Sequence, residues 1–357
     1  ELPGNHEARE KSPSPRSISG GFVPELHVDI EAIGRNTEAV AALLREHCLD
    51  LVAVTKGCLG EPRVAAAMLA AGAFALADTR DANLRRLREA LPGAELHRIH
   101  LPSLTEPFEP GDVTYVSCPE GAEAVARLAD GLQAPRKVMV LVETGDEREG
   151  VPPELLPGLA GRIAGEPRLT LVGVATNYAC FKGGAAGIEE SVKTVALAAE
   201  TLDAAGYSLQ RVSGGNSSLL GLLAKGGRIP QRVTELRCGE ALLLGQDALH
   251  YEPLPGCRID ACVLRAEVVE EYTKPAAEGP IRRSVLGIGR QDLSTGAVRP
   301  VQPGLREVGR SADYLVLEAV GRGAWAPVGT TIEMIPSYEA LVAAWTSPYV
   351  ALKLRGR

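Results

Sequence analysis

The chain has 357 residues, of which 45% are hydrophobic and 23% are charged, a composition that is ordinary for a globular protein with one large and one smaller domain. The formal net charge of −7 and the lack of a basic, aromatic-rich stretch exclude a typical nucleic-acid-binding protein. No apolar run approaches the length of a membrane span and the amino terminus carries no secretory apolar core, so we expect no membrane partner.

Seven cysteines are scattered along the chain, without a CxxC pair and without the Cys/His spacing of a metal site. An odd number of cysteines with no regular spacing is typical of reduced thiols inside the cell. We therefore expect a cytoplasmic protein with no bound metal.

The amino-terminal segment differs in composition from the rest of the chain. Residues 1–22 are polar and rich in Pro, Gly and Ser, so we expect residues 1–24 to be a disordered tail. Residues 24–47 predict a strand followed by a helix. This first strand belongs either to the domain that directly follows it or to the domain at the other end of the chain.

Residues 25–240 alternate short apolar runs with Ala/Leu-rich stretches of helical pattern. The runs that predict strands lie at 51–56, 73–78, 95–100, 113–117, 137–143, 169–176, 210–215 and 234–240. The clearest helical patterns between them lie at 61–72, 81–92, 121–132 and 189–206. Eight strands separated by helices predict a closed (β/α)8 TIM-type barrel. An open, doubly wound sheet is the alternative, but no GxGxxG motif follows the first of these strands.

Residues 241–357 have a different pattern, with β-rich runs joined by segments that contain Pro and Gly. These runs lie at 260–272, 282–292, 312–320 and 329–335. They predict a smaller, all-β carboxyl-terminal domain of about a hundred residues.

Polar residues stand at the ends of nearly all predicted barrel strands. Because the carboxyl ends of barrel strands form one mouth, we expect these side chains to share a site. They are Lys56, Asp78, His100, Ser117, Glu143, Thr144, Asn177 and Arg237. The lysine is the most informative, since an amine at the end of a buried strand can form a Schiff base.

The loop "SGGNSS" at 213–218 is a candidate phosphate site, because its glycines allow close approach of the backbone and its serines add hydroxyl donors. A strand-end lysine together with a phosphate loop suggests pyridoxal 5'-phosphate. Arg237 and Arg148 fit the same cofactor, since a guanidinium facing the pyridine nitrogen keeps that nitrogen unprotonated. Taken singly, each feature is more often a solvated lysine, a turn or a surface ion pair.

From about residue 25 to its end, the chain resembles the alanine-racemase-like (fold-type III) pyridoxal phosphate enzymes, most closely the ornithine racemase branch. The resemblance rests on six segments in the same order, namely "VAVTKG", "ETGDEREG", "ATNYACF", "SGGNSS", "LRCGE" and "PSYEAL". The ornithine branch is favoured by "SGGNSS", "GDEREG", "IGRQD" and the closing "TSPYV".

The resemblance implies a role for one residue in each segment. Lys56 would hold the cofactor as an aldimine and act as one catalytic base, and Arg148 would reach the phenolic oxygen of the cofactor. Asn177 stands where alanine racemases carry a ring-stacking histidine, and Arg237 would meet the pyridine nitrogen. The phosphate contacts would come from Ser217 in the loop that starts at Ser213, from Gly239 and from Tyr338.

The second acid/base is the point at which this chain departs from the family pattern. Alanine racemases supply a tyrosine in an "SYG" segment of the partner subunit, whereas "TKPAAEGPIRRS" here has none. A phosphate-contacting tyrosine just after the lysine segment is missing too, and Leu59 lies near its place. The candidates to replace the second base are Cys58, His250, Tyr251 and Tyr272. His250 and Tyr251 are favoured, because they follow "LLLGQD" at the junction of the two domains.

The function implied is racemisation of ornithine or of another basic or polar amino acid, in a homodimer. Asp247, Asp292 and Glu149 are the candidates to meet a distal ammonium group. The alternatives are a decarboxylase or another biosynthetic pyridoxal phosphate enzyme of the same fold, and a non-catalytic carrier of the cofactor. Arg237 argues against decarboxylation and the β-rich domain argues against a carrier.

Overall fold

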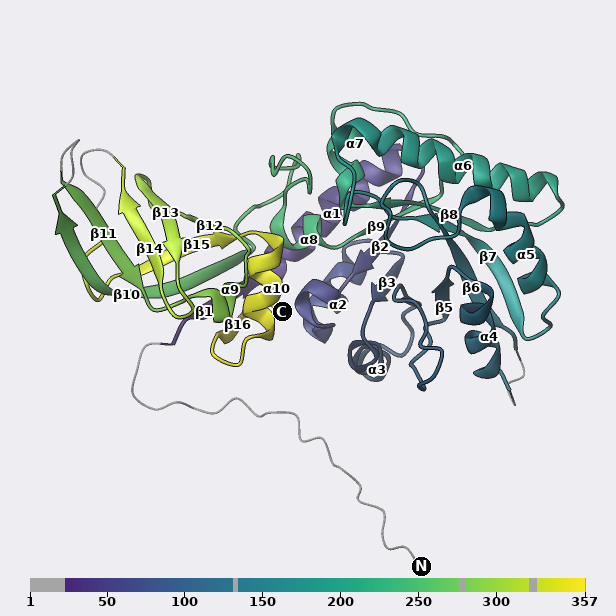
Figure 1. The fold of residues 1–357 in the computed structure, drawn as a ribbon, viewed down its shortest axis with the longest axis horizontal. Helices are drawn as coiled ribbons and strands as arrows, with labels where there is room; N and C mark the ends of the chain where they lie inside the picture. The colour runs from purple at the N-terminus through teal and green to yellow at the C-terminus, as the bar shows by residue number, and fades with distance from the viewer. Residues whose placement is uncertain (1–22, 131–133, 276–279, 321–325, 357) are drawn as a thin grey trace, which may run out of the picture.

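The computed structural model describes residues 23–130, 134–275, 280–320 and 326–356, which form a barrel and a β-sheet lying side by side (Figure 1). The expected disordered tail falls, up to residue 22, outside the described residues. None of the described helices combines the length and the apolar character needed to cross a membrane.

The barrel confirms the predicted (β/α)8 architecture. Its eight parallel strands are β2 (Asp50–Val54), β3 (Ala75–Asp78), β4 (Leu96–Arg98), β5 (Val113–Val116), β6 (Arg136–Val142), β7 (Leu169–Thr176), β8 (Arg211–Asn216) and β9 (Glu235–Cys238). β9 pairs with β2 and closes the ring. Strands such as β3 and β5 are buried along their whole length, because the barrel interior covers one face and helices cover the other.

Helices precede the first barrel strand, follow the last, and lie in all the connections between them except that from β4 to β5. They are α1 (Ile30–Glu46), α2 (Pro62–Ala70), α3 (Asp81–Ala90), α4 (Pro119–Arg127), α5 (Leu156–Ala164), α6 (Ile188–Ala204), α7 (Leu220–Ala224) and α8 (Glu240–Leu244). Short 3-10 turns add η1 (Lys56–Cys58), η2 (Pro153–Leu155), η3 (Ala185–Gly187) and η4 (Ser217–Leu219). α5 is not among the clearest helical patterns of the sequence, since it contains a proline and two glycines. Pro157 lies in its first turn, where a missing backbone N–H costs no hydrogen bond.

The second part is an eight-stranded sheet with the order β12-β15-β10-β11-β14-β13, to which β1 and β16 add beside β10. Its elements are β1 (Glu25–Asp29), β10 (Cys262–Lys274), β11 (Ile281–Leu286), α9 (Arg290–Leu293), β12 (Val298–Pro300), β13 (Leu305–Arg310), β14 (Leu315–Ala319), β15 (Thr331–Pro336), α10 (Tyr338–Thr346) and β16 (Ala351–Arg355). The first half of β10 alternates buried and half-buried residues, which is typical of a strand with one covered face.

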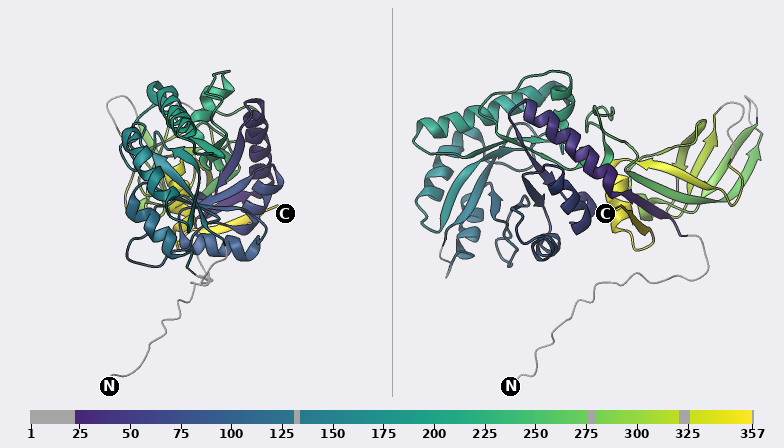
Figure 2. Two further views of the ribbon diagram at one scale, coloured as in Figure 1. Left: turned by 90° about the vertical axis from the view of Figure 1, so that its right-hand side faces the viewer. Right: turned by 180° about the vertical axis from the view of Figure 1, so that it is seen from behind.

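Both ends of the chain contribute to this sheet. β1 pairs with β10 in antiparallel and with β16 in parallel orientation, so the first strand lies outside the barrel. α1 then leaves the sheet and packs on α2 and α8 of the barrel, as the right-hand view of Figure 2 shows. The Asp29 carboxylate caps α1 by accepting a hydrogen bond from the backbone N–H of Ala32.

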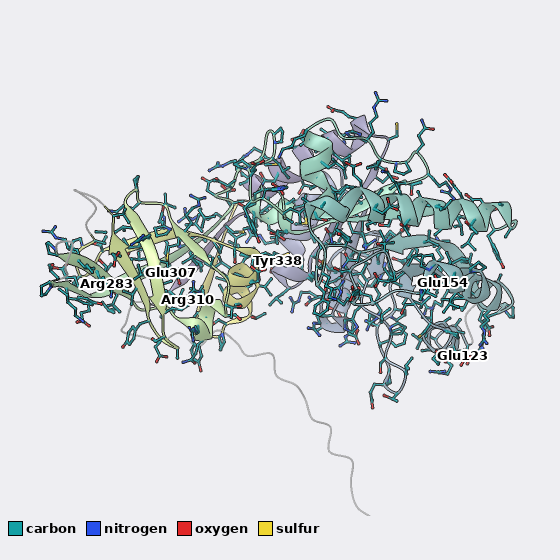
Figure 3. The ribbon with its side chains drawn as sticks, turned by 45° about the horizontal axis from the view of Figure 1, so that its top comes forward. Glu123, Glu154, Arg283, Glu307, Arg310 and Tyr338 are labelled. Carbon is teal, nitrogen blue, oxygen red and sulfur yellow. The ribbon has the colours of Figure 1, made fainter. Side chains whose placement is uncertain are left out.

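The helix α10 lies between the sheet and the barrel and packs against η1, the turn that carries Lys56. Tyr338, the first residue of α10, therefore sits at the junction of the two parts (Figure 3). The sheet residues Arg283, Glu307 and Arg310 lie at a distance from this junction in the same view. The chain thus brings a carboxyl-terminal tyrosine to the end of the first barrel strand.

Candidate active site

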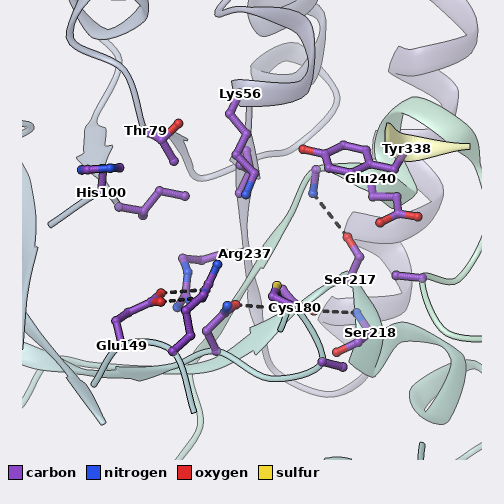
Figure 4. A pocket seen from close by; sticks show the side chains of 18 of the residues that line it. Lys56, Thr79, His100, Glu149, Cys180, Ser217, Ser218, Arg237, Glu240 and Tyr338 are labelled. Atoms are coloured by element: carbon purple, nitrogen blue, oxygen red, sulfur yellow. Dashed lines mark hydrogen bonds and ion pairs between the residues drawn. The ribbon is translucent and has the colours of Figure 1, made fainter. Parts of the chain in front are cut away.

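A cavity of about 680 Å³ opens at the carboxyl ends of the barrel strands, next to α10 (Figure 4). Its polar lining residues are Lys56, Thr79, His100, Tyr115, Arg148, Glu149, Asn177, Cys180, Asn216, Ser217, Ser218, Arg237, Glu240, Tyr251, Tyr338 and Glu339. Four of the predicted strand-end residues are among them, namely Lys56, His100, Asn177 and Arg237. The carboxyl ends of the strands therefore do converge on one site.

Lys56 is positioned by the residue before it and by the neighbouring strand. The Thr55 hydroxyl donates to the Asp78 carboxylate at 2.6 Å, and the Thr55 backbone N–H donates to Ala77. The Asp78 carboxylate also accepts hydrogen bonds from the Thr79 backbone N–H and the Asn83 side chain, and it does not line the cavity. Within the described part of the chain, the Lys56 amine has neither an ion pair nor a hydrogen bond, although its side chain lies in the cavity (Figure 4). It is free to react with a ligand.

Arg237 is a buried cation that the barrel holds without a contacting carboxylate among the described residues. Its two terminal nitrogens donate to the Ser213 hydroxyl and to the Thr176 carbonyl, both at 2.5 Å. Its guanidinium carbon lies 5.2 Å from the centre of the Tyr115 ring. Only part of the predicted phosphate loop lines the cavity. Ser217 and Ser218 do, whereas the Ser213 side chain supports Arg237 and does not reach the cavity. A fixed, always charged donor suits an unprotonated ring nitrogen.

A cradle of hydroxyl and backbone N–H groups lies on another wall of the cavity. The Ser217 oxygen accepts from the backbone N–H of Gly239 at 3.3 Å and of Ala241 at 3.4 Å. Gly239 packs so tightly on β2 that a Cβ atom there would lie 2.7 Å from the Val54 carbonyl oxygen. The Tyr338 side chain lies beside this group in Figure 4. Such donors are suited to a phosphate group.

Arg148 and Asn177 complete the predicted cofactor set on the remaining side of the cavity. Arg148 is ion-paired with Glu149 at 2.5 Å and lies 3.3 Å from Asp146. The Asn177 side-chain oxygen accepts from the Asn216 amide at 2.9 Å, which fixes its orientation. The free lysine, the buried arginine and the phosphate-type cradle together fit pyridoxal 5'-phosphate in kind and in placement.

The family model named "Alanine racemase, N-terminal domain" matches residues 28–247, which cover the barrel and the cavity residues up to Glu240. The chain belongs to this family. A lysine racemase from Thermotoga maritima is 28% identical over 92% of this chain and 97% of its own length. An ornithine racemase from Acetoanaerobium sticklandii is 25% identical over 93% of this chain and 99% of its own length.

The solved structures agree on the fold of this family member. The alanine racemase of Streptomyces lavendulae superposes with a TM-score of 0.71 at 17% identity, over 95% of this chain and 98% of that chain. The predicted resemblance to alanine-racemase-like enzymes is confirmed, and the relatives support an amino-acid racemase.

The four candidates for the second acid/base lie in different surroundings. Tyr251 lines the cavity, whereas His250 does not, and the His250 Nδ1 lies 3.3 Å from an oxygen of Asp247. The Cys58 thiol is buried, donates to the Thr55 carbonyl, and burial raises its pKa to about 12. Tyr272 lies on β10, paired with Arg283 of β11, in the sheet. Of the four, the structure brings Tyr251 to the cavity.

The three candidates for a distal ammonium group are also dispersed. Glu149 lines the cavity but is paired with Arg148. Asp247 does not line it, and its oxygens accept backbone N–H groups from residues 249, 250 and 252. Asp292 caps the short helix α9 and accepts from Ser347, so it belongs to the sheet.

Two acidic residues of the cavity, Glu240 and Glu339, were not identified from the sequence. Both directly follow residues that were, Gly239 and Tyr338, in "LRCGE" and "PSYEAL". Burial and the negative charges of Glu339 and Asp247 raise the pKa of Glu240 to about 7, although the positive charge of Lys56 acts in the opposite direction. An acid at the end of the last barrel strand was a usable signal for Glu240, whereas Glu339 reaches the cavity through the docking of α10.

Proposed function

We propose that the protein is a pyridoxal 5'-phosphate-dependent racemase of a basic amino acid, with ornithine and lysine as the first substrates to test. The observation that carries this proposal is the convergence of an unpaired lysine, a buried arginine and a phosphate-type cradle in one cavity. The activities named for the two curated relatives support the choice of reaction and of substrate class.

The cofactor, when bound, supplies an electron sink that makes the α-proton of the amino acid acidic. In the proposed mechanism, Lys56 Nζ removes that proton and the Tyr251 hydroxyl supplies one to the α-carbon from another side. Tyr251 is preferred to His250 because it lines the cavity. Burial and the charges of Glu240, Glu339 and Asp247 raise the pKa of Tyr251, so its hydroxyl keeps its proton at neutral pH.

Arg237 favours racemisation over decarboxylation in this proposal. Its hydrogen bonds to Ser213 and Thr176 hold the guanidinium in a buried position. There it would face the ring nitrogen of the bound cofactor without giving it a proton. With Arg237 there, the cofactor would withdraw electrons more weakly, which would favour return of a proton to the α-carbon over other reactions.

The proposed assembly is a homodimer in which the sheet of one subunit approaches the cavity of the other. Exposed apolar side chains support this arrangement at both places. Phe181 is 68% and Tyr251 is 55% exposed near the cavity, and Tyr314 and Tyr349 are half exposed on the side of the sheet. Sedimentation of the cofactor-loaded protein tests it, and an active monomer would rule it out.

The decisive test of the function is incubation of the loaded protein with a panel of L-amino acids in deuterated water. Chiral analysis and mass measurement should find the D-enantiomer carrying one deuterium at the α-carbon, with ornithine or lysine among the best substrates. Release of carbon dioxide and an amine would identify a decarboxylase instead. The absence of any product from a fully loaded protein would identify a cofactor carrier.

A further inference from the structure

Tyr251, which lines the cavity, has an unfavourable backbone conformation. Its φ angle is 57°, in the left-handed region that residues with bulky side chains rarely adopt. In the residues that the structure describes, its hydroxyl makes no hydrogen bond, and 55% of the residue is exposed. The backbone of its loop therefore sets the direction of the side chain, and such a conformation persists only where the surrounding structure enforces it.

The loop of Tyr251 is held from inside by one buried residue, Asp247, which is 2% exposed. The two carboxylate oxygens of Asp247 accept hydrogen bonds from the backbone N–H groups of residues 249, 250 and 252 at 2.9, 2.8 and 3.2 Å. The backbone carbonyl of Asp247 accepts from the Tyr251 N–H at 3.2 Å. Four consecutive backbone N–H groups, with that of Tyr251 among them, thus donate to the same residue.

The barrel fixes Asp247 in turn. A Cβ atom added to Gly221 of α7 would lie 3.3 Å from the Cβ and Cγ atoms of Asp247, so α7 packs directly on this side chain. The ends of the loop are joined by an antiparallel bridge between Gln246 and Pro253. The carboxylate is therefore enclosed between a barrel helix and the loop, and loss of its hydrogen bonds would leave buried N–H groups unpaired.

The charge of Asp247 also acts on the proton that Tyr251 carries. Burial, followed by the negative charges of Glu240, Glu339 and Asp247, raises the pKa of the Tyr251 hydroxyl. A nearby negative charge disfavours the ionised phenolate. The side chain that holds the loop thus also helps to keep the phenol in the form that can donate a proton.

We infer that Asp247 is a positioning residue, whose carboxylate holds the loop so that the Tyr251 hydroxyl reaches the α-carbon of the substrate. Asp247 does not itself line the cavity. The inference rests on the proposed function, in which Tyr251 is the second proton donor. Because Lys56 is presented by a separate turn, η1, Asp247 should affect only one of the two proton transfers.

The test separates the two proton transfers in Asp247→Ala, with ornithine or lysine as substrate. Racemisation should slow on the order of 10- to 100-fold, because a small displacement of a reacting group has an effect of that size. Exchange of the α-proton that faces Lys56 should stay within about twofold of the wild-type rate, since the two sites are independent. Nuclear magnetic resonance of each pure enantiomer in deuterated water measures this exchange. An equal loss of both rates would overturn the inference.

Two further variants separate positioning from a general loss of stability. Asp247→Asn keeps one acceptor oxygen but loses the charge, so it should racemise faster than Asp247→Ala. Asp292→Ala is the matched control, because Asp292 is also buried and accepts from the backbone N–H of Gly289 in the sheet. It should lower stability without changing the ratio of racemisation to α-proton exchange. The same change of ratio in Asp292→Ala as in Asp247→Ala would contradict a specific role of Asp247.

A double-mutant cycle tests whether Asp247 acts through Tyr251. Adding Asp247→Ala to Tyr251→Phe should slow racemisation by no more than about twofold beyond Tyr251→Phe alone, because the hydroxyl that Asp247 positions is already absent. If the effects of the two single substitutions simply multiply, Asp247 acts by another route and the inference is wrong.

A measurement on the cofactor-free protein does not depend on turnover. The chain has eight tyrosines, so ring-labelled tyrosine gives a simple nuclear magnetic resonance spectrum, and the signal missing from Tyr251→Phe belongs to Tyr251. In Asp247→Ala this signal should move toward that of a fully exposed tyrosine, and in Asp292→Ala it should stay in place. An unmoved signal in Asp247→Ala would overturn the inference.

Failure of the proposed function gives a different result. If the loaded wild-type protein racemises no amino acid, the proposed function fails, and the tyrosine signal decides whether Asp247 holds Tyr251 in place. If the wild-type protein is a racemase that Tyr251→Phe slows and Asp247→Ala does not, the inference alone is contradicted.

Discussion

Tyr338 lies against Gly57, the residue that follows Lys56. A Cβ atom on Gly57 would lie 3.0 Å from Cε2 and 3.2 Å from the hydroxyl oxygen of Tyr338, and 2.9 Å from a methyl carbon of Leu243. The absence of a side chain at position 57 therefore allows α10 to dock on the turn that presents Lys56. The two predicted cofactor residues farthest apart in the sequence are joined through this contact.

We expect Gly57→Ala to displace the Tyr338 ring, weaken cofactor binding and lower the free energy of unfolding by about 1–3 kcal/mol, because the new methyl group overpacks the contact. Urea unfolding and titration with the cofactor measure the two effects. Gly34→Ala is the matched control, since no atom lies within 4 Å of its added Cβ. It should stabilise α1 by about 0.5–1 kcal/mol. Cofactor affinity unchanged in Gly57→Ala would mean that the contact does not position Tyr338.

Tyr251→Phe should reduce racemisation by about 10²- to 10⁴-fold, because it removes the proposed second proton donor. One enantiomer should still exchange its α-proton with deuterated solvent through Lys56, and nuclear magnetic resonance of each pure enantiomer measures this exchange. His250→Gln is the companion variant, whose side chain is held near Asp247 outside the cavity. If His250→Gln abolishes racemisation and Tyr251→Phe does not, the two assignments must be exchanged.

Arg237→Glu should slow racemisation and increase formation of the keto acid, since an acid in that position would protonate the ring nitrogen and strengthen electron withdrawal. Chromatography of the keto acid measures the side reaction. Because a buried charge reversal can unfold the protein, cofactor binding is measured first. Ser213→Ala removes one hydrogen bond to Arg237 without introducing an acid, so it should slow racemisation less and should not increase the keto acid. Parental racemisation by a loaded Arg237→Glu variant would place Arg237 away from the ring nitrogen.

The stability of the cofactor-free protein should depend on pH through Glu240. Its pKa is raised to about 7 from an ordinary value of 4.5, so the folded state binds the proton more tightly than the unfolded state. The contribution of this proton is therefore fully present below about pH 4.5 and is lost as the pH rises through 7. Compared with the wild type, Glu240→Gln should become progressively more stable between these pH values. Parallel urea midpoints across the range would show that Glu240 has an ordinary pKa.

The barrel was predictable from the sequence because its strands are buried on both faces and read as uninterrupted apolar runs. β3 and β5 are examples, with every residue buried. The exact residue at which each strand ends was less predictable. The run expected to end at Lys56 ends at Val54, because the Thr55 hydroxyl pairs with Asp78 and the chain turns into η1. The order of residues still placed Lys56 at the mouth.

Roles that depend on tertiary docking were not predictable. Ser213 and Ser217 belong to one predicted loop, but Ser213 lies within β8 and supports Arg237, whereas Ser217 begins η4 and supports the cradle. Asp247 is an acid near the site whose oxygens are occupied by its own loop. Glu339 reaches the cavity only because α10 packs on η1, a contact between distant segments that no local pattern encodes.

The central claim is that Lys56 holds pyridoxal 5'-phosphate in this cavity, and chemical capture of the cofactor tests it most directly. The loaded protein is reduced with borohydride and digested, and the pyridoxyl-labelled peptide is identified by mass spectrometry. We expect the label on Lys56 at a stoichiometry near one per chain, and we expect Lys56→Ala to take up none. Label on another lysine, such as the surface residues Lys182 or Lys225, would contradict the assignment of this cavity as the active site.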